Sequence, residues 1–242
     1  MMRNNLMIDT LTRFFPGRNT KMLASSRTVA FATVFLLATP LTGHAAPAQV
    51  EGGQTSVLFG NGALDALGLT ITYASPDVGA GNLGPNSVSF GMNSRSEAGG
   101  ALDTTFVYDS PNFAPFSGAI EHSGRIQFNN AIDVGDFTIR ADAGRPAGTS
   151  GFVVESTFGL SAILFDIANP IIEAFDNSLV ISADILVSPE LAGALYKPEL
   201  AGVDAGMALV DANSTVVPIP AAAWLFGSGL IGMIGIARRK KS

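Results

Sequence analysis

Short apolar runs alternate with clusters of Gly, Asn, Asp, Pro and Ser between residues 46 and 216. Inside the runs, apolar and polar positions tend to alternate, as where Phe137, Ile139 and Ala141 are separated by polar residues. This period of two is typical of β-strands with one buried face. It predicts strands at 55–59, 69–73, 87–91, 104–108, 117–121, 124–129, 136–141, 151–157, 161–167 and 179–187. A helix is expected only at 189–196, where Pro189 and Glu190 suit a first helical turn.

Strands spaced about ten residues apart, with no helices between them, predict an antiparallel all-β domain. We expect a β-sandwich over residues 46–216, with a barrel-like fold as the alternative. A segment of this length is large enough for one hydrophobic core. The chain is 47% hydrophobic and only 14% charged, which excludes the disordered class.

The N-terminal 45 residues have the pattern of an export signal. Basic residues from Lys21 onwards precede an apolar run at 28–41, and small residues around Gly43 and Ala45 follow it. This order is that of a secretory signal peptide, and we predict cleavage after Ala45. Cleavage after Ala48 is also allowed, because small residues precede that position too. Met22 is an alternative start, because residues 1–20 have no role in a signal.

The C-terminal segment 217–242 has the pattern of a membrane segment. Residues 221–237 carry no charge, and at about 1.5 Å per residue these 17 residues just span a thin hydrocarbon core. A basic cluster follows, made of Arg238, Arg239, Lys240 and Lys241. Such a cluster stays cytoplasmic by the positive-inside rule. The sequence therefore predicts one transmembrane helix with the β-domain outside.

This tail resembles the PEP-CTERM sorting signal in its Val-Pro-Leu-Pro-Ala variant. The residues on the motif are Val217, Pro218, Ile219, Pro220 and Ala221, with Ile219 replacing the usual leucine. The resemblance implies an exosortase as processing partner, and delivery from an inner-membrane intermediate to the cell surface or the exopolysaccharide matrix of a Gram-negative bacterium. From the residues alone, a permanent single-pass anchor is an equal alternative; the resemblance favours processing.

The charge of the domain excludes some partners. Between residues 46 and 217 there are five Lys and Arg against 19 Asp and Glu, a net charge of −14. Such a surface repels phosphate backbones and anionic headgroups, so we expect no nucleic-acid partner and no docking onto a membrane face. Divalent cations remain candidates. The chain has no cysteine, which excludes disulfides, thiolate metal sites and cysteine nucleophiles.

Motifs for catalysis are sparse in the β-domain. His122 is its single histidine, and no Gly-x-Ser-x-Gly elbow accompanies it, so a structural or surface role is expected for this ring. The glycines at 79–84 and 227–232 match a dinucleotide fingerprint by letters only. The first match runs into Pro85 and the second lies in the apolar tail, so neither opens a helix that binds a pyrophosphate.

Carboxylates in turn-rich segments are the candidates for a metal site. Asp133 with Asp136, or Asp142 near Asn129 and Asn130, offers the oxygen ligands that calcium prefers. A solvated acidic surface explains the same residues, and no calcium-binding loop motif is present. The sequence therefore assigns no metal ligands.

We expect a noncatalytic surface or matrix protein with no cofactor. Exopolysaccharide is a candidate partner. The composition argues against it, because sugar sites use aromatic faces for stacking, the domain has few tyrosines, and Trp224 lies in the tail. One alternative is a secreted hydrolase, which needs two acids about 5–9 Å apart in one cleft. A cation- or ligand-binding surface module is the other.

Overall fold

The protein is described by a computed structural model over residues 47–95, 102–217 and 226. By compactness the chain divides into a unit of residues 1–42 and a unit of residues 43–242, and every described residue belongs to the second unit. The predicted signal peptide with its cleavage site after Ala45 lies outside the described residues. So does the predicted tail from residue 218 onwards, apart from Phe226.

The described residues form thirteen strands of one antiparallel sheet and two short α-helices. The strands are β1 (Pro47–Phe59), β2 (Ile71–Ala74), β3 (Gly79–Ala80), β4 (Val88–Gly91), β5 (Val107–Asp109), β6 (Phe113–Ser117), β7 (Ala119–Glu121), β8 (Arg125–Phe128), β9 (Ile132–Ala141), β10 (Phe152–Gly159), β11 (Ala162–Ala174), β12 (Ser178–Val187) and β13 (Asp204–Val216). The helices are α1 (Ala63–Leu67) and α2 (Pro189–Ala194), and a 3-10 turn, η1, covers Pro198–Leu200.

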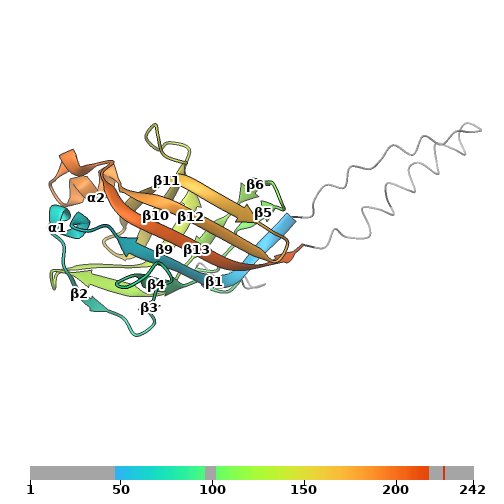
Figure 1. Cartoon of the computed structure of the whole chain (residues 1–242), viewed down its shortest axis with the longest axis horizontal. Coiled ribbons are helices and arrows are strands. Elements are labelled where there is room, and N and C mark those ends of the chain that lie inside the picture. Colours follow the sequence, from blue (N-terminus) through green and yellow to red (C-terminus); the bar gives the residue numbers. More distant parts are fainter. Residues whose placement is uncertain (1–46, 96–101, 218–225, 227–242) are drawn as a thin grey trace, which may run out of the picture. The chain divides into compact units, whose positions relative to one another are not determined.

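Hydrogen bonding connects the strands in the order β2-β8-β9-β10-β11-β12-β13-β1-β4-β3, with β5, β6 and β7 attached beside this path. From β8 to β13 each strand pairs with its neighbour in sequence, and β13 then pairs with β1. The sheet curls into a half-barrel, with α1 and α2 at one end (Figure 1). Twist accumulating over many strands produces this kind of curl.

The antiparallel all-β prediction is confirmed, and each predicted strand overlaps an observed one. The strands belong to one curled sheet, so the barrel-like form of the prediction describes it better than two facing sheets. The predicted helix is present as α2, two residues shorter than expected. It is capped by Ser188, whose hydroxyl accepts a hydrogen bond from the backbone N–H of Leu191 at 2.9 Å.

Strand β13 is the largest element that the sequence pattern did not predict. Its inward positions carry small residues such as Ala205, Ala208 and Ala212, which have weak strand preference. It is held by antiparallel ladders to β12 on one side and β1 on the other. Gly206 permits the close approach of β1, because a Cβ there would lie 2.1 Å from the carbonyl oxygen of Leu58. Non-local pairing therefore overrides the local preference.

The core fills the inside of the curl in two adjoining clusters. One contains an aromatic group in which Phe106 and Tyr108 are completely buried and pack against Phe113. The other lies beneath α1 and α2 and includes Phe90 and Phe137, whose ring centroids are 4.7 Å apart. The two clusters together hold the half-barrel around a single apolar interior.

Candidate functional site

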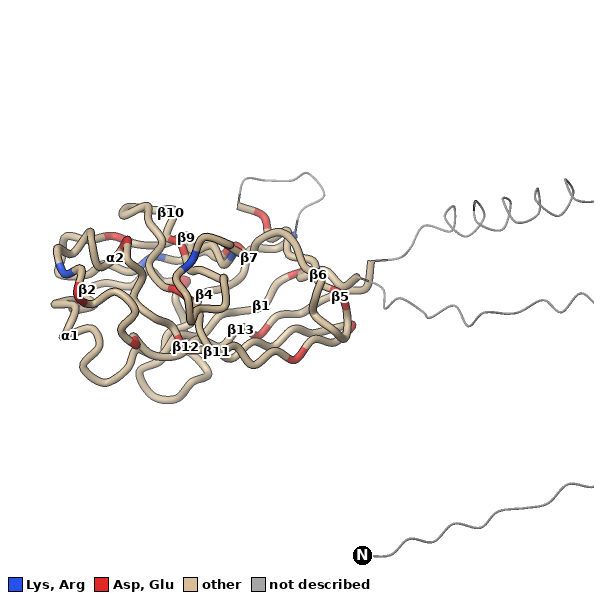
Figure 2. Tube along the Cα trace, turned by 90° about the horizontal axis from the view of Figure 1, so that it is seen from above, with Lys and Arg blue, Asp and Glu red and all other residues tan. Residues whose placement is uncertain are grey.

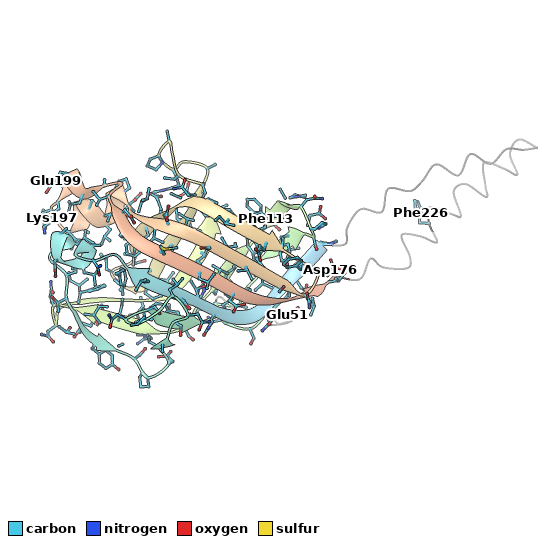
Figure 3. The ribbon with its side chains drawn as sticks, in the orientation of Figure 1. Glu51, Phe113, Asp176, Lys197, Glu199 and Phe226 are labelled. Carbon is cyan, nitrogen blue, oxygen red and sulfur yellow. The ribbon has the colours of Figure 1, made fainter. Side chains whose placement is uncertain are left out.

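The two ends of the described domain lie on neighbouring strands. Ala48 of β1 pairs with Val216 of β13, and the N–H of Val217 donates to the carbonyl oxygen of Pro47 at 2.7 Å. Both ends are therefore at one end of the sheet, near Glu51 and Asp176 (Figure 3).

Val217 is the one residue of the predicted sorting motif that the structure describes. Pro218, Ile219, Pro220 and Ala221, the basic cluster Arg238, Arg239, Lys240 and Lys241, and the cleavage residue Ala45 lie outside the described residues. Among the residues that are described, no helix has the length and apolar character needed to cross a membrane. Of the predicted span at 221–237, only Phe226 is among them.

His122 is buried between strands. Its Nδ1 lies 2.9 Å from the carbonyl oxygen of Phe137, and its Nε2 lies 2.7 Å from the hydroxyl of Thr55. A carbonyl only accepts, so Nδ1 carries the proton and Nε2 accepts from Thr55. Burial lowers the pKa of the ring from 6.5 to about 4, which keeps it neutral at physiological pH. The ring is thus a structural link, as expected, with no carboxylate among its hydrogen-bond partners.

The structure separates the residues of one of the two candidate calcium sites. Asn129 and Asn130 precede β9 and Asp142 follows it, so about 30 Å of strand lies between them. These three residues therefore do not converge on one site. The side chain of Asn129 is instead used in its turn, where it accepts from the N–H of Thr70 and donates to the carbonyl of Gly68. Within the described ranges, no group of three or more acids or histidines is placed to hold a metal ion.

Asp133 and Asp136 do share a surface feature. They line a depression of about 380 Å³ that crosses β2, β8, β9 and β10 near the edge of the sheet. We call it the Arg125 depression; its lining residues are Tyr73, Ser75, Asp77, Gly124, Arg125, Asp133, Asp136 and Phe158. Along β8, Ile126 and Phe128 point into the core while Arg125 points outwards, so the depression lies on the solvent face.

Arg125 is held at the centre of this depression by two neighbours. Its guanidinium carbon lies 3.6 Å from the ring centroid of Phe158, and its Nη2 lies 3.5 Å from the carboxylate of Asp136. Gly135 makes room for the side chain, because a Cβ there would lie 2.6 Å from Arg125 Cγ. The Arg125 side chain is still 49% exposed, so its guanidinium remains accessible to solvent.

The other polar groups of the depression are also oriented by neighbours. Ser75 donates to the carboxylate of Asp77 and accepts from the backbone N–H of Arg125. Gln127 donates to Asp133 at 3.0 Å. Asp77 and Asp133 therefore already accept hydrogen bonds, and Asp136 forms an ion pair with Arg125.

Tyr73 is the exposed aromatic residue of the depression. It stands on the edge strand β2, its side chain is 54% exposed, and within the described residues its hydroxyl has no hydrogen-bond partner. Asp133 and Asp136 could be picked out from the sequence, whereas Tyr73, Arg125 and Phe158 could not. Strand alternation places Arg125 on the solvent face, but only the pairing of β2 with β8 brings Tyr73 beside it.

The interior of the half-barrel contains a second cavity. It is apolar, has a volume of about 60 Å³, and lies among residues such as Val57, Leu164 and Ile185. The hydroxyl of Thr55 and the ring of His122 are at its wall and bond each other. Since an apolar cavity of roughly 150 Å³ is needed to hold benzene, this space is too small for an organic ligand.

No family model and no curated protein matches this chain.

Proposed function

We propose that this chain is an exported, noncatalytic cell-surface or extracellular-matrix protein that an exosortase processes through its C-terminal tail, residues 217–242. The observation that carries the proposal is the hydrogen bond between Val217 and Pro47. It puts the two points at which the predicted membrane segments join the domain on adjacent strands, about 5 Å apart.

This arrangement suits a precursor that is tethered to a membrane at both ends. The predicted signal peptide ends two residues before Pro47, and the predicted tail begins at Val217. Both connections leave the same end of the sheet, so neither has to cross the surface of the domain. The rest of the half-barrel is then free to extend away from the membrane.

The chemistry of residues 217 and 218 also suits processing. The ladder of β1 and β13 ends with the N–H of Val217, and Pro218 has no N–H with which to continue it. The sheet therefore ends where the sorting motif begins. A protease needs an extended segment outside the folded sheet, and the motif prolines favour that conformation.

The test is the intact mass of the protein purified from its native host, with and without the exosortase. We expect loss of both ends in the wild-type strain, and retention of the tail in the strain that lacks exosortase. The double variant Pro218→Ala/Pro220→Ala should retain the tail in both strains, whereas Pro198→Ala, on the exposed turn η1, should be processed normally. A tail that persists from Ala221 onwards in both strains contradicts sorting and indicates a permanent anchor.

A further inference from the structure

We propose that the Arg125 depression binds a segment of a hydroxyl-rich polysaccharide that carries no negative charge, either neutral or bearing free amino groups. The inference relies on the proposed function for the source of its ligand, the extracellular matrix. The geometry of the depression supports the inference whether or not the protein is exported. At about 380 Å³ the depression is within the range of roughly 300–1,000 Å³ typical of small-molecule sites.

Tyr73 provides the stacking surface of this site. A tyrosine ring offers an apolar face together with a polar hydroxyl, and both parts of Tyr73 are available at the sheet edge. A sugar ring has an apolar face of C–H groups and a rim of hydroxyls, so it complements such a residue. The second aromatic ring of the depression, Phe158, is covered by Arg125 and braces the guanidinium instead.

Hydroxyl groups of a sugar need donors and acceptors together, and the depression provides both. Arg125 supplies N–H donors, and Asp77, Asp133 and Asp136 supply carboxylate acceptors. Contacts with Ser75, Gln127 and Phe158 hold these groups in place before any ligand arrives. Polar groups that are oriented in advance lose less conformational entropy on binding.

Charge decides which saccharides fit. The depression has three carboxylates and one guanidinium. Figure 2 shows Asp and Glu positions scattered along the trace of the domain. Polyanionic saccharides and phosphates are therefore repelled, and amino sugars are attracted. A metal ion fits less well, because the guanidinium of Arg125 lies among the carboxylates and already pairs with Asp136.

The experiment is calorimetric titration of the full-length chain, purified in mild detergent, with three tetrasaccharides. The probes are a glucosamine tetramer, an N-acetylglucosamine tetramer and a galacturonate tetramer. We expect both of the first two to bind, the glucosamine tetramer more tightly and with an affinity that falls as salt rises. The galacturonate tetramer should not bind.

Two tyrosine variants locate the site. Tyr73→Ala should weaken binding of both tetramers at least tenfold, whereas Tyr196→Ala should leave it unchanged. Tyr196 is a matched control, because it is 93% exposed, follows α2 and does not line the Arg125 depression. Equal thermal unfolding of the two variants shows that the domain is intact. If Tyr73→Ala fails to fold, Asp133→Asn is used instead. This variant should weaken binding of the glucosamine tetramer at least threefold more than binding of the N-acetylglucosamine tetramer.

Three outcomes overturn the inference. The first is no binding of either the glucosamine or the N-acetylglucosamine tetramer. The second is binding that Tyr73→Ala and Tyr196→Ala weaken equally. Where Asp133→Asn is used instead, the corresponding outcome is an equal loss of affinity for the glucosamine and N-acetylglucosamine tetramers. The third is cleavage of a tetramer during the titration, which indicates a hydrolase. Because these measurements use purified protein, they fail or succeed independently of the sorting experiment.

Discussion

Arg145 and Asp166 form a buried, two-pronged ion pair between the loop after β9 and the middle of β11. The guanidinium of Arg145 donates to both carboxylate oxygens of Asp166, at 2.5 and 3.0 Å, and the two side chains are only 7% and 2% exposed. Arg145 also donates to Glu190 in the first turn of α2, at 2.7 and 2.9 Å, and this pairing lowers the pKa of Glu190. One arginine thus joins a loop, a strand and a helix.

The first prediction concerns this ion pair. Arg145→Ala leaves the carboxylate of Asp166 buried without a partner, so we expect the free energy of unfolding to fall by about 3–5 kcal/mol. Arg140→Ala is the control, because Arg140 pairs with Glu155 in a partly exposed position and its loss should cost about 1 kcal/mol or less. Urea unfolding measures both. Similar losses for the two variants would show that burial does not strengthen the Arg145 pair.

The second prediction concerns pH. The pKa of His122 is about 4 in the folded protein and 6.5 in the unfolded chain, so between these values the unfolded chain binds more protons. Stability from this ring is complete above about pH 6.5 and is lost as the pH falls towards 4. At about 1.4 kcal/mol per pH unit, the loss amounts to roughly 3 kcal/mol.

His122→Gln tests this dependence, measured as unfolding free energy at several pH values. Burial raises the pKa of Glu121, and hydrogen bonds from Arg145 lower that of Glu190, so other groups also change stability with pH. Those contributions are common to both proteins. Between pH 4 and 6.5, the unfolding free energy should therefore rise less steeply with pH in the variant, and the difference in slope is the contribution of His122. Identical slopes would contradict a buried neutral ring.

The third prediction concerns the contact of β1 with β13. Gly206→Ala places a methyl group 2.1 Å from the carbonyl oxygen of Leu58, at a residue whose φ of 135° disfavours any side chain. We expect a loss of at least about 2 kcal/mol in unfolding free energy, or failure to fold. Gly193→Ala in α2 meets nothing within 4 Å and should be neutral or stabilise by up to about 1 kcal/mol. Tolerance of alanine at 206 would show that the two strands separate easily.

The fourth prediction concerns the cap of α2. The hydroxyl of Ser188 is buried, accepts from Leu191 N–H and donates to the carbonyl oxygen of Ile163 at 2.6 Å. Ser188→Ala removes both bonds and should lower the unfolding free energy by about 1–2 kcal/mol. Ser188→Thr keeps the hydroxyl and should recover part of the lost unfolding free energy. Thermal unfolding distinguishes the three proteins, and an unchanged midpoint in the alanine variant would mean that the cap is unimportant.

The Arg125 depression illustrates why the site was only half visible in the sequence. Asp133 and Asp136 are close in the chain and lie in turn-rich sequence, so their proximity was expected. Tyr73 and Phe158 are 85 residues apart, and they line the same depression because β2 pairs with β8, β8 with β9, and β9 with β10. No local signal specifies those three pairings.

The sequence by itself determined the features that depend on neighbouring residues. Alternation of period two marked the all-β class and overlapped the observed strands, and proline and acid after Ser188 marked α2, because side-chain direction and capping are local properties. Its patterns at 1–45 and 217–242 also carry the predictions of export and sorting, which the described residues do not test.

Only the tertiary structure decided how the sheet is completed. Strand β13 has weak local preference and forms because β12 and β1 supply hydrogen bonds on both sides. The same pairing brings Pro47 beside Val217, and the curl of the sheet brings Arg145 to Asp166. These contacts join residues far apart in the chain, and their free energy comes from ladder bonds and burial that exist only once the strands have assembled.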